Sequence, residues 1–293
     1  MRLALLGFGL IGGSLARALR ATRQDVSLQV DEIVAWSPSG AGPATALAER
    51  VIDEAATDPE TALADADLIV LAGPAPDILA QLDQLAGPWS GWVRTGAVIT
   101  DVASTKAVIV ERAAALGLPF VGGHPMAGRE SSGYEASSAD LFVDRPWVVV
   151  PGADEAAAGR IEQLAAATGA VPRRMTATDH DEAAAAVSHL PLILAAALVE
   201  AVVGGRAGAR DDWPVAAGLA ATGWRDMTRL ARGDATMGAG IAVTNAPRIA
   251  RRIRDVVEVL DSWATELERA DGPDREAVAG RLRLARERLE ASS

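Results

Sequence analysis

The first half of the chain alternates short apolar runs with longer segments in which apolar residues recur at helical spacing. Uninterrupted apolar runs are typical of strands buried on both faces, and their alternation with helices predicts a parallel sheet covered by helices. Asp58-Pro59 predicts a helix start, with Asp as N-cap and Pro at the first position. The other predicted helices are residues 10–21, 44–50 and 153–168, and the predicted strands are residues 2–7, 33–36, 68–72, 97–102, 120–123, 146–151 and 170–173.

After about residue 175 the strand pattern stops and helical patterns follow. Residues 178–203 predict a long helix, opened by a capping box of Thr178 and Asp181. This segment carries more apolar residues than one exposed face tolerates, which predicts burial on several sides, with a second subunit as one source. Pro191 should bend it. With further helices at residues 213–231, 247–269 and 273–291, we expect an α/β fold of two domains, the sheet in residues 1–175 and an all-α domain in residues 176–293.

The turn GFGLIG at residues 7–12 follows the first predicted strand and opens the first predicted helix. Gly7 permits the tight turn, Gly9 lets a pyrophosphate approach the backbone, and Gly12 lets helix and strand pack closely. The helix start adds free amide hydrogens and a partial positive charge. In this context the motif predicts a Rossmann-type domain that binds a dinucleotide, rather than a merely structural turn, with further cofactor contacts at Leu10, Ile11 and Ser14.

The residue that ends the second predicted strand bears on the choice of cofactor. An acidic residue there would bind the ribose 2′-hydroxyl of NAD, but the chain has Ser37. Ser37 carries no charge to repel a 2′-phosphate, which favours NADP, although no arginine follows in residues 38–45 to bind that phosphate. Both NAD and NADP therefore stay open, with a slight preference for NADP. In the alternative, Ser37 simply hydrogen-bonds the ribose.

Ligands of open α/β sheets gather at the carboxyl ends of the strands. Three predicted strands end in Gly73-Pro74, in DVASTK (101–106) and in GGHPMAG (122–128), which makes Gly73, Pro74 and Asp101 candidate cofactor contacts. His124 lies in the third of these segments, where a Gly/Pro-rich backbone suits a crevice better than a core. A neutral imidazole can accept a proton from an alcohol during hydride loss. A structural histidine in a turn is the alternative.

Composition draws attention to Lys106. The chain has 28 lysines and arginines together, and Lys106 is its single lysine. Arginine can replace lysine at most solvated positions, but not where a compact ammonium is needed. Lys106 is therefore a candidate to reach the nicotinamide ribose or a substrate carboxylate, or to orient Asp101. Chance survival of one lysine is the alternative.

Bulk properties exclude several functions. A formal charge of −11 argues against nucleic acid as a partner, whereas an anionic small molecule needs only local positive contacts. The absence of cysteine excludes disulfides and thiolate chemistry, and no spacing of metal ligands suggests a metal. The N-terminal apolar run is too short for a signal peptide, and no run reaches the roughly 20 uninterrupted apolar residues of a membrane span. We therefore expect a soluble, cytoplasmic protein without a membrane partner.

The second half carries candidate polar residues of its own. His180 and His189 lie nine residues apart on the long predicted helix, where His180 can simply cap or bind its neighbours. His189 precedes Pro191, which frees a backbone carbonyl and distorts the turn. Arg225 and Arg229 share one helical face, and a guanidinium suits a carboxylate. A solvated face with an Arg–Asp pair is the alternative.

Five segments in order resemble prephenate dehydrogenase: GFGLIGGS (7–14), DVASTK (101–106), GGHPMAGRE (122–130), HDEAAAAVSHLP (180–191) and GWRDMTRLA (223–231). The resemblance implies a Rossmann domain and a helical domain that makes a homodimer. It also implies oxidation of prephenate, or of arogenate, with loss of the ring carboxylate to give 4-hydroxyphenylpyruvate or tyrosine.

The resemblance further implies roles for single residues. His124 would accept the hydrogen bond from the ring hydroxyl, and Ser104 would orient both groups near the nicotinamide. Arg229 would hold a substrate carboxylate. The other implied assignments are His189 as a substrate contact, Glu130 as a polar residue at the rim, and Arg225 with Asp226 as an internal pair that positions Arg229.

Two rival functions stay open on the sequence. A β-hydroxyacid dehydrogenase would place a catalytic lysine on the long interdomain helix, which here has none. A non-catalytic NADP-sensing protein would need the glycine turn, but not the combination of His124, Ser104 and Arg229. Turnover of prephenate would separate all three.

Overall fold

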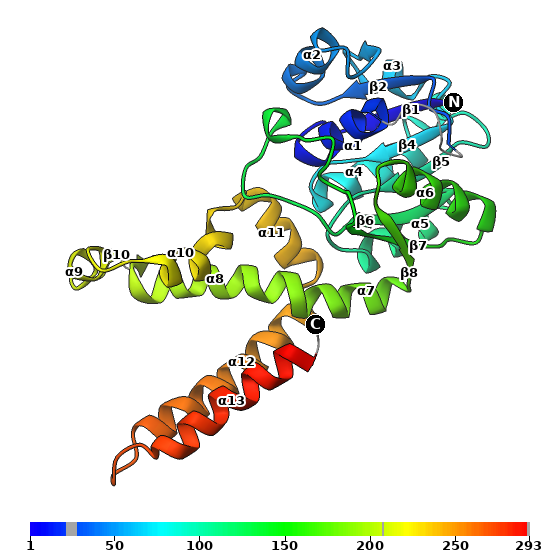
Figure 1. Ribbon diagram of the computed structural model, residues 1–293. Coiled ribbons are helices and arrows are strands. Elements are labelled where there is room, and N and C mark those ends of the chain that lie inside the picture. The colour runs from blue at the N-terminus through cyan, green and yellow to red at the C-terminus, as the bar shows by residue number, and fades with distance from the viewer. Residues whose placement is uncertain (22–27, 207, 292–293) are drawn as a thin grey trace. The chain divides into compact units, whose positions relative to one another are not determined.

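The computed structural model describes residues 1–21, 28–206 and 208–291. Residues 22–27, 207 and 292–293, which the two predicted domains include, lie outside these ranges. By its packing the chain divides into two units, Met1–Ala246 and Pro247–Ser293, which are described separately (Figure 1). The predicted domain boundary near residue 175 stays a prediction.

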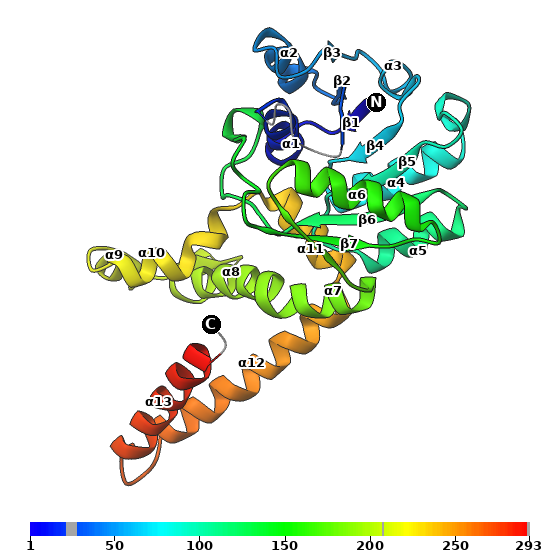
Figure 2. The same cartoon turned by 45° about the vertical axis from the view of Figure 1, so that its right-hand side comes forward.

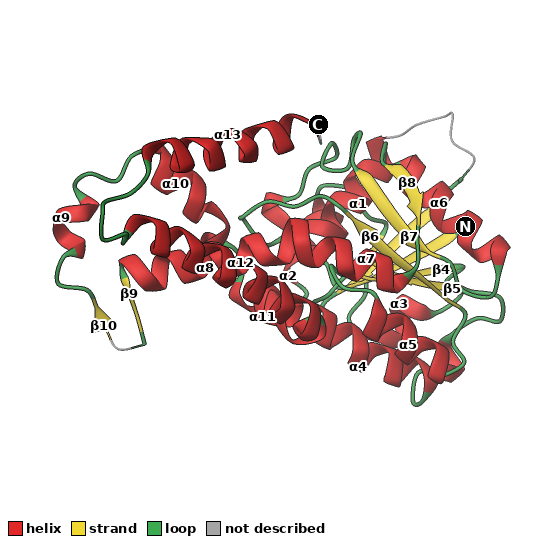
Figure 3. Ribbon diagram, turned by 90° about the horizontal axis from the view of Figure 1, so that it is seen from below, coloured by secondary structure: helices red, strands yellow, loops and turns green. Residues whose placement is uncertain are grey.

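One eight-stranded sheet of order β3-β2-β1-β4-β5-β6-β7-β8 organises the first unit (Figure 3). Its pairs are parallel except β6 with β7, which run antiparallel. A parallel pair needs a crossover, usually helical, whereas β6 and β7 are joined by a loop whose regular structure is the 3-10 turn Tyr134–Ala136. The strands are β1 Arg2–Leu6, β2 Glu32–Trp36, β3 Glu54–Ala55, β4 Leu68–Leu71, β5 Val98–Asp101, β6 Phe120–Pro125, β7 Pro146–Val150 and β8 Val171–Arg174.

The seven predicted strands are confirmed with small shifts at their ends, and β3 is an additional, two-residue strand. The helices of this part are α1 Leu10–Ala21, α2 Ala41–Ala48, α3 Pro59–Leu63, α4 Ala75–Ala86, α5 Ala107–Ala115 and α6 Glu155–Ala167. Asp58 caps α3 as predicted, because its carboxylate accepts the Thr61 N–H.

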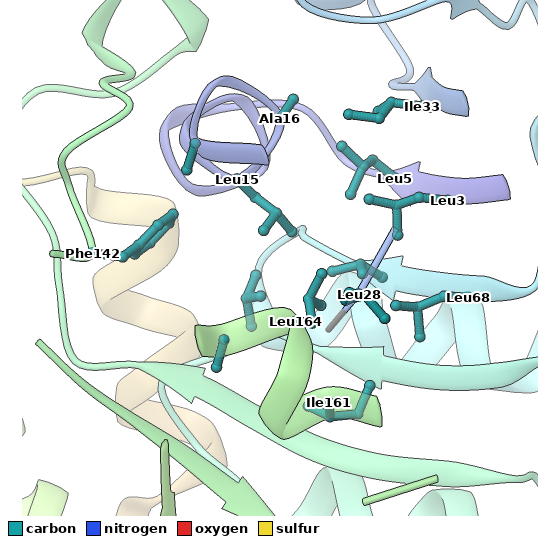
Figure 4. Close-up of a cluster of buried hydrophobic side chains, with 14 of the residues drawn as sticks. Leu3, Leu5, Leu15, Ala16, Leu28, Ile33, Leu68, Phe142, Ile161 and Leu164 are labelled. Carbon is teal, nitrogen blue, oxygen red and sulfur yellow. The ribbon is translucent and has the colours of Figure 1, made fainter. Parts of the chain in front are cut away.

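Alternation along β1 divides the core between the two faces of the sheet. Leu3 and Leu5 point toward α1 and α6, where they meet Leu15 and Leu164 (Figure 4). Ala4 and Leu6 point to the opposite face, which α3, α4 and α5 cover. Each fully buried leucine contributes about 1.5–3 kcal/mol, so both faces hold the strand ends in fixed positions.

The long helix predicted at residues 178–203 consists of α7 Ala177–Ala184, the π-helical turn η3 Ala185–His189 and α8 Leu190–Val202. The predicted capping box is wrong by two residues: Thr176 is the N-cap and accepts from Asp179 N–H. The π turn lies immediately before Leu190-Pro191, where proline removes a backbone donor, and the predicted bend stays a prediction.

Burial of this helix on several sides is not found within the single chain. Of α8, only Ala195 is buried by the described residues of the first unit. By length and composition alone, Ala177–Val202 is also the one helix in the described ranges that can cross a membrane. Its polar start nevertheless packs inside the protein, since His180 and Asp181 are buried.

The rest of the first unit after α8 is more broken than predicted. Residues 213–231 form α9 Trp213–Ala217, α10 Thr222–Thr228 and the 3-10 turn η4 Arg229–Arg232 instead of one helix. Gly218 ends α9, as expected from the cost of glycine in a helix. An additional helix, α11, spans Ala235–Thr244, and a two-stranded ladder, β9 Gly204–Gly205 with β10 Gly208–Ala209, interrupts the otherwise helical region.

The second unit is a helical hairpin, visible in Figure 2. Its helices are α12 Ala246–Leu267, which starts at the last residue of the first unit, and α13 Arg275–Ala291, close to the predicted bounds. Arg281 joins them, because its guanidinium lies 3.9 Å from the Trp263 ring centroid and donates to the Ser262 carbonyl.

Candidate active site

The glycine turn has the geometry that a dinucleotide requires. Gly7 has φ 100°, and a Cβ there would lie 2.7 Å from the Ala72 backbone. A Cβ on Gly12 would lie 2.7 Å from the Gly7 carbonyl oxygen, so only glycine lets α1 approach β1 this closely. At Gly9, by contrast, no described atom lies within 4 Å of an added Cβ. That open space at the start of α1 fits a pyrophosphate.

The other predicted cofactor residues lie around this turn with different exposure. Leu10, Ile11, Ser37, Gly73 and Pro74 are half-buried at the ends of β1, β2 and β4. Ser14 is fully buried, and its hydroxyl accepts the Ser138 N–H at 3.0 Å. Ser14 therefore holds a loop in place, and a direct cofactor contact from it stays a prediction.

That loop, residues 126–145 between β6 and β7, is called here the β6–β7 loop. Tyr134 stacks on Phe8 of the glycine turn at a ring distance of 5.3 Å, and its hydroxyl donates to Glu49 at 2.7 Å. Arg17 of α1 donates to Ser137. A Cβ on Gly13 would lie 2.7 Å from the Tyr134 ring, so this glycine makes room for the loop.

Asp101 and Lys106 form a fully buried ion pair at the end of β5. Asp101 also accepts the Ala103 N–H and the Gly123 N–H, each at 3.0 Å. Burial lowers the pKa of Lys106, and the Asp101 carboxylate offsets this only in part. Of the roles expected for Lys106, the structure displays one, orientation of Asp101. Contacts of either residue with cofactor or substrate stay predictions.

His124 is the penultimate residue of β6 and is 6% exposed. Its Nδ1 lies 2.8 Å from His180 Nε2, and His180 Nδ1 lies 2.8 Å from an Asp181 carboxylate oxygen. Burial, reinforced by the nearby His180, Lys106 and His189, holds the pKa of His124 well below its usual value. The imidazole is therefore neutral at neutral pH and ready to accept a proton.

His189 is fully buried, with both ring nitrogens engaged inside the protein. Nε2 lies 3.1 Å from the Ser104 carbonyl oxygen, and Nδ1 lies 3.2 Å from Asn245 Nδ2. Burial lowers the pKa of His189 to about 4, so the ring is neutral and its Nε2–H donates to Ser104. His189 thus anchors the segment that carries Ser104, and its predicted contact with substrate would require one of these bonds to break.

Arg229 and Glu130 come together as an ion pair, with Arg229 59% exposed. The 3-10 turn η4 supplies the guanidinium, and the β6–β7 loop supplies the carboxylate. The predicted pair of Arg225 with Asp226 is wrong, because these two exposed residues form no ion pair within the part of the chain that the structure describes. Both residues lie on α10, where their side chains are exposed.

The sequence missed three residues that the structure brings to the site. His180 and Asp181 were interpreted as helix-start residues, and Asn245 was not singled out at all. The adjacent His-Asp pair, one helical turn after the true cap at Thr176, was the signal for an inward-facing polar cluster. Asn245 follows α11 and donates to the Asp181 carbonyl at 2.9 Å, which no local pattern predicts.

The fold and the site define the chain as an NAD(P)-dependent oxidoreductase, with the cofactor turn and a neutral imidazole at the carboxyl edge of one sheet. Two family models narrow this class. Prephenate dehydrogenase, nucleotide-binding domain, matches residues 15–172, and prephenate dehydrogenase, dimerization domain, matches residues 176–279. The chain belongs to the prephenate dehydrogenase family.

Known proteins agree with this assignment. Prephenate dehydrogenase of Bacillus subtilis is 32% identical over 273 residues, which cover 91% of this chain and 70% of the relative. The crystal structure of Synechocystis arogenate dehydrogenase is 30% identical, with a TM-score of 0.76 and coverage of 99% of this chain and 100% of that one. Prephenate dehydrogenase from A. aeolicus, in complex with hydroxyphenyl propionate and NAD+, is 25% identical with a TM-score of 0.82, covering 99% and 98%.

Proposed function

We propose that this chain catalyses the oxidative decarboxylation of prephenate or arogenate with NAD(P)+, a step of tyrosine biosynthesis. The observation that carries the proposal is the buried, neutral His124 at the end of β6, on the edge of the sheet where the glycine turn also opens. Support comes from the relatives, which act as prephenate, arogenate or cyclohexadienyl dehydrogenases by name.

The side chains suit each part of this reaction. NAD(P)+ supplies the hydride acceptor when bound. Nε2 of His124 takes the proton of the ring hydroxyl as the hydride leaves the carbon that bears this hydroxyl. The bond to the ring carboxylate then breaks, carbon dioxide leaves, and the electron pair completes the aromatic ring. The phenolate oxygen takes the proton back from His124, so protons balance without any other acid.

Binding roles in this proposal fall to residues around His124. Arg229 exchanges Glu130 for a substrate carboxylate, which a guanidinium can bind in a bidentate manner. Ser104, whose backbone carbonyl accepts a hydrogen bond from His189, orients the substrate hydroxyl toward His124. The direct test is steady-state turnover of prephenate and of arogenate with each cofactor, with a β-hydroxyacid as control substrate. Turnover of the β-hydroxyacid alone, or of no substrate, would reject the proposal.

The slight preference for NADP also belongs to the proposal. Ser37 and the first turn of α2, residues 41–44, place no carboxylate near the end of β2. We expect Ser37→Asp to shift preference toward NAD, because a carboxylate repels a 2′-phosphate and binds a ribose hydroxyl. The measurement is the ratio of kcat/KM for NADP to that for NAD. An unchanged ratio would show that Ser37 does not face the ribose.

Assembly and location complete the proposal: a cytoplasmic homodimer formed through the helices after residue 175. The match of residues 176–279 to a dimerization domain supports the dimer. The gap between the two matched segments, at residues 173–175, supports the domain boundary near residue 175. Apolar side chains on α12 stay exposed in the single chain: Val257, Val259, Leu260 and Leu267. Sedimentation should show a dimer at micromolar concentration, and a monomer throughout would contradict this assembly.

A further inference from the structure

Three buried side chains, beginning with the proposed base, form a hydrogen-bonded row. His124 is the first, His180 the second and Asp181 the third, with 2.8 Å between each pair of bonded atoms. The exposed fractions of their side chains are 6%, 2% and 0%. Two elements supply them, β6 and α7, so the row forms only when the helix packs against the strand.

Asp181 fixes the direction of the hydrogen bonds in this row. Its carboxylate accepts three bonds: the Lys106 N–H at 2.7 Å, the Ala107 N–H at 2.9 Å and the bond from His180. Burial raises the pKa of Asp181, but these hydrogen bonds outweigh it, and the pKa lies below its usual value. Asp181 is therefore ionised and can only accept, which places a proton on Nδ1 of His180.

The position of that proton determines the state of His124. In its neutral form, with the proton on Nδ1, His180 has an unprotonated Nε2, which accepts a hydrogen bond from His124 Nδ1. Nδ1 of His124 must then be the donor, and Nε2 of neutral His124 carries no proton. No described residue hydrogen-bonds this Nε2. It is thus the one ring nitrogen of the row available to a substrate hydroxyl.

We propose that His180 is a positioning residue for His124. Bound to Asp181, it holds His124 in the tautomer that presents an unprotonated Nε2 to the reacting hydroxyl. It also supports the imidazolium that forms when Nε2 takes the proton, because the donor at His124 Nδ1 keeps its acceptor throughout. This inference rests on the proposed function for the identity of the substrate, but its tautomer assignment does not depend on any substrate.

Of the groups around His124, His180 and Asp181 are the ones that can stabilise its positive charge. The other titratable groups that face His124 are Lys106, after β5, and His189, on η3, and both disfavour a positive charge on it. The Lys106 ammonium is bound by Asp101, and His189 is bound by Ser104 and Asn245. The carboxylate of Asp181, reached through His180, is therefore the negative group coupled by hydrogen bonds to the ring that must become charged.

The tautomer is directly measurable, because the chain contains three histidines. In protein labelled with 15N at histidine, long-range correlation spectra separate protonated from unprotonated ring nitrogens. We expect His124 of the parent protein to carry its proton on Nδ1 at neutral pH. In His180→Leu this preference should disappear. A parent protein with the proton of His124 on Nε2 would overturn the proposal whether or not the chain turns over prephenate.

Kinetics test the consequence. His180→Leu should lower kcat at least about tenfold, toward the limit of about 10²–10⁴ that a positioned base supplies, with little change in KM. His180→Gln, whose amide oxygen can accept from His124, should recover part of this loss. Thr178→Ala, on the exposed side of α7, is the matched control and should leave kcat unchanged. An unchanged kcat in folded His180→Leu, or equal losses in His180→Gln and His180→Leu, would refute positioning by His180.

Discussion

Lys106→Arg tests whether the buried ion pair with Asp101 sets the position of the strand that carries His124. Lys106 is fully buried and packs directly against Gly122, because a Cβ added to that glycine would lie 3.3 Å from the Lys106 Cδ. A longer, planar guanidinium does not fit this space without displacing its neighbours. Overpacking of this kind costs about 1–3 kcal/mol of stability. A shift of Asp101 also moves the Gly123 N–H that it binds. Since a displacement of about 1 Å at a reacting group can cost about 10²-fold, we expect kcat/KM to fall by at least tenfold.

The assay is kcat/KM with the denaturation midpoint measured on the same preparations. Arg283→Lys on α13 is the control, because Arg283 forms an exposed ion pair with Glu276 and such pairs contribute about 0–1 kcal/mol. Lys106→Met leaves Asp101 buried without its partner and should cost about 3–5 kcal/mol, whereas Lys106→Met with Asp101→Asn should cost less than the sum of the single changes. If Lys106→Arg matches Arg283→Lys in both measurements, the reasoning from burial is refuted.

The remaining predictions concern the proposed base, its protonation and the substrate carboxylate. His124→Asn should retain cofactor affinity while kcat falls by about 10²–10⁴, and a fully active variant would remove His124 from the mechanism. Because the pKa of His124 is lowered in the folded protein, kcat should stay level as pH falls through 6.5 and decline only below it; a decline centred near 6.5 would contradict this. Burial also lowers the pKa of His189 to about 4, so the unfolded chain binds more protons than the folded chain between pH 4 and 6.5. The midpoint of thermal unfolding should therefore decrease as the pH is lowered from 6.5 to 4. Arg229→Ala should raise KM for substrate strongly with a smaller change in kcat, whereas an unchanged KM would place Arg229 outside the binding site.

Local patterns predicted the sheet well, because its strands are short apolar runs buried on both faces. The glycine turn was also predictable, because Gly7 and Gly12 are required by close backbone contacts within one βαβ unit. Long-range features were not. The antiparallel direction of β7 depends on how a loop without a crossover helix packs, and the inward orientation of His180 depends on how α7 packs against β6.

Predictions for the site followed the same division. His124 and Lys106 were singled out by their place at strand ends. In the structure Lys106 lies close enough to His124 to help lower the pKa of its ring. The partners themselves lie far away in the chain: Asp181 is 75 residues from Lys106, and Asn245 is 56 from His189. No periodicity encodes such pairings. The failed pair of Arg225 with Asp226 was implied by the family resemblance alone, and both side chains are exposed on α10.

The anchoring of the β6–β7 loop has a consequence for protein engineering. Through Tyr134 on Phe8 and Ser138 on Ser14, the peptide that follows His124 is fastened to the nucleotide-binding turn. The placement of the glycine turn and that of the β6–β7 loop, which carries Glu130, are therefore coupled. A chimera that imports the first βαβ unit of another dehydrogenase would lose the seat for Tyr134 and misplace Glu130, unless residues 126–145 are transplanted with it.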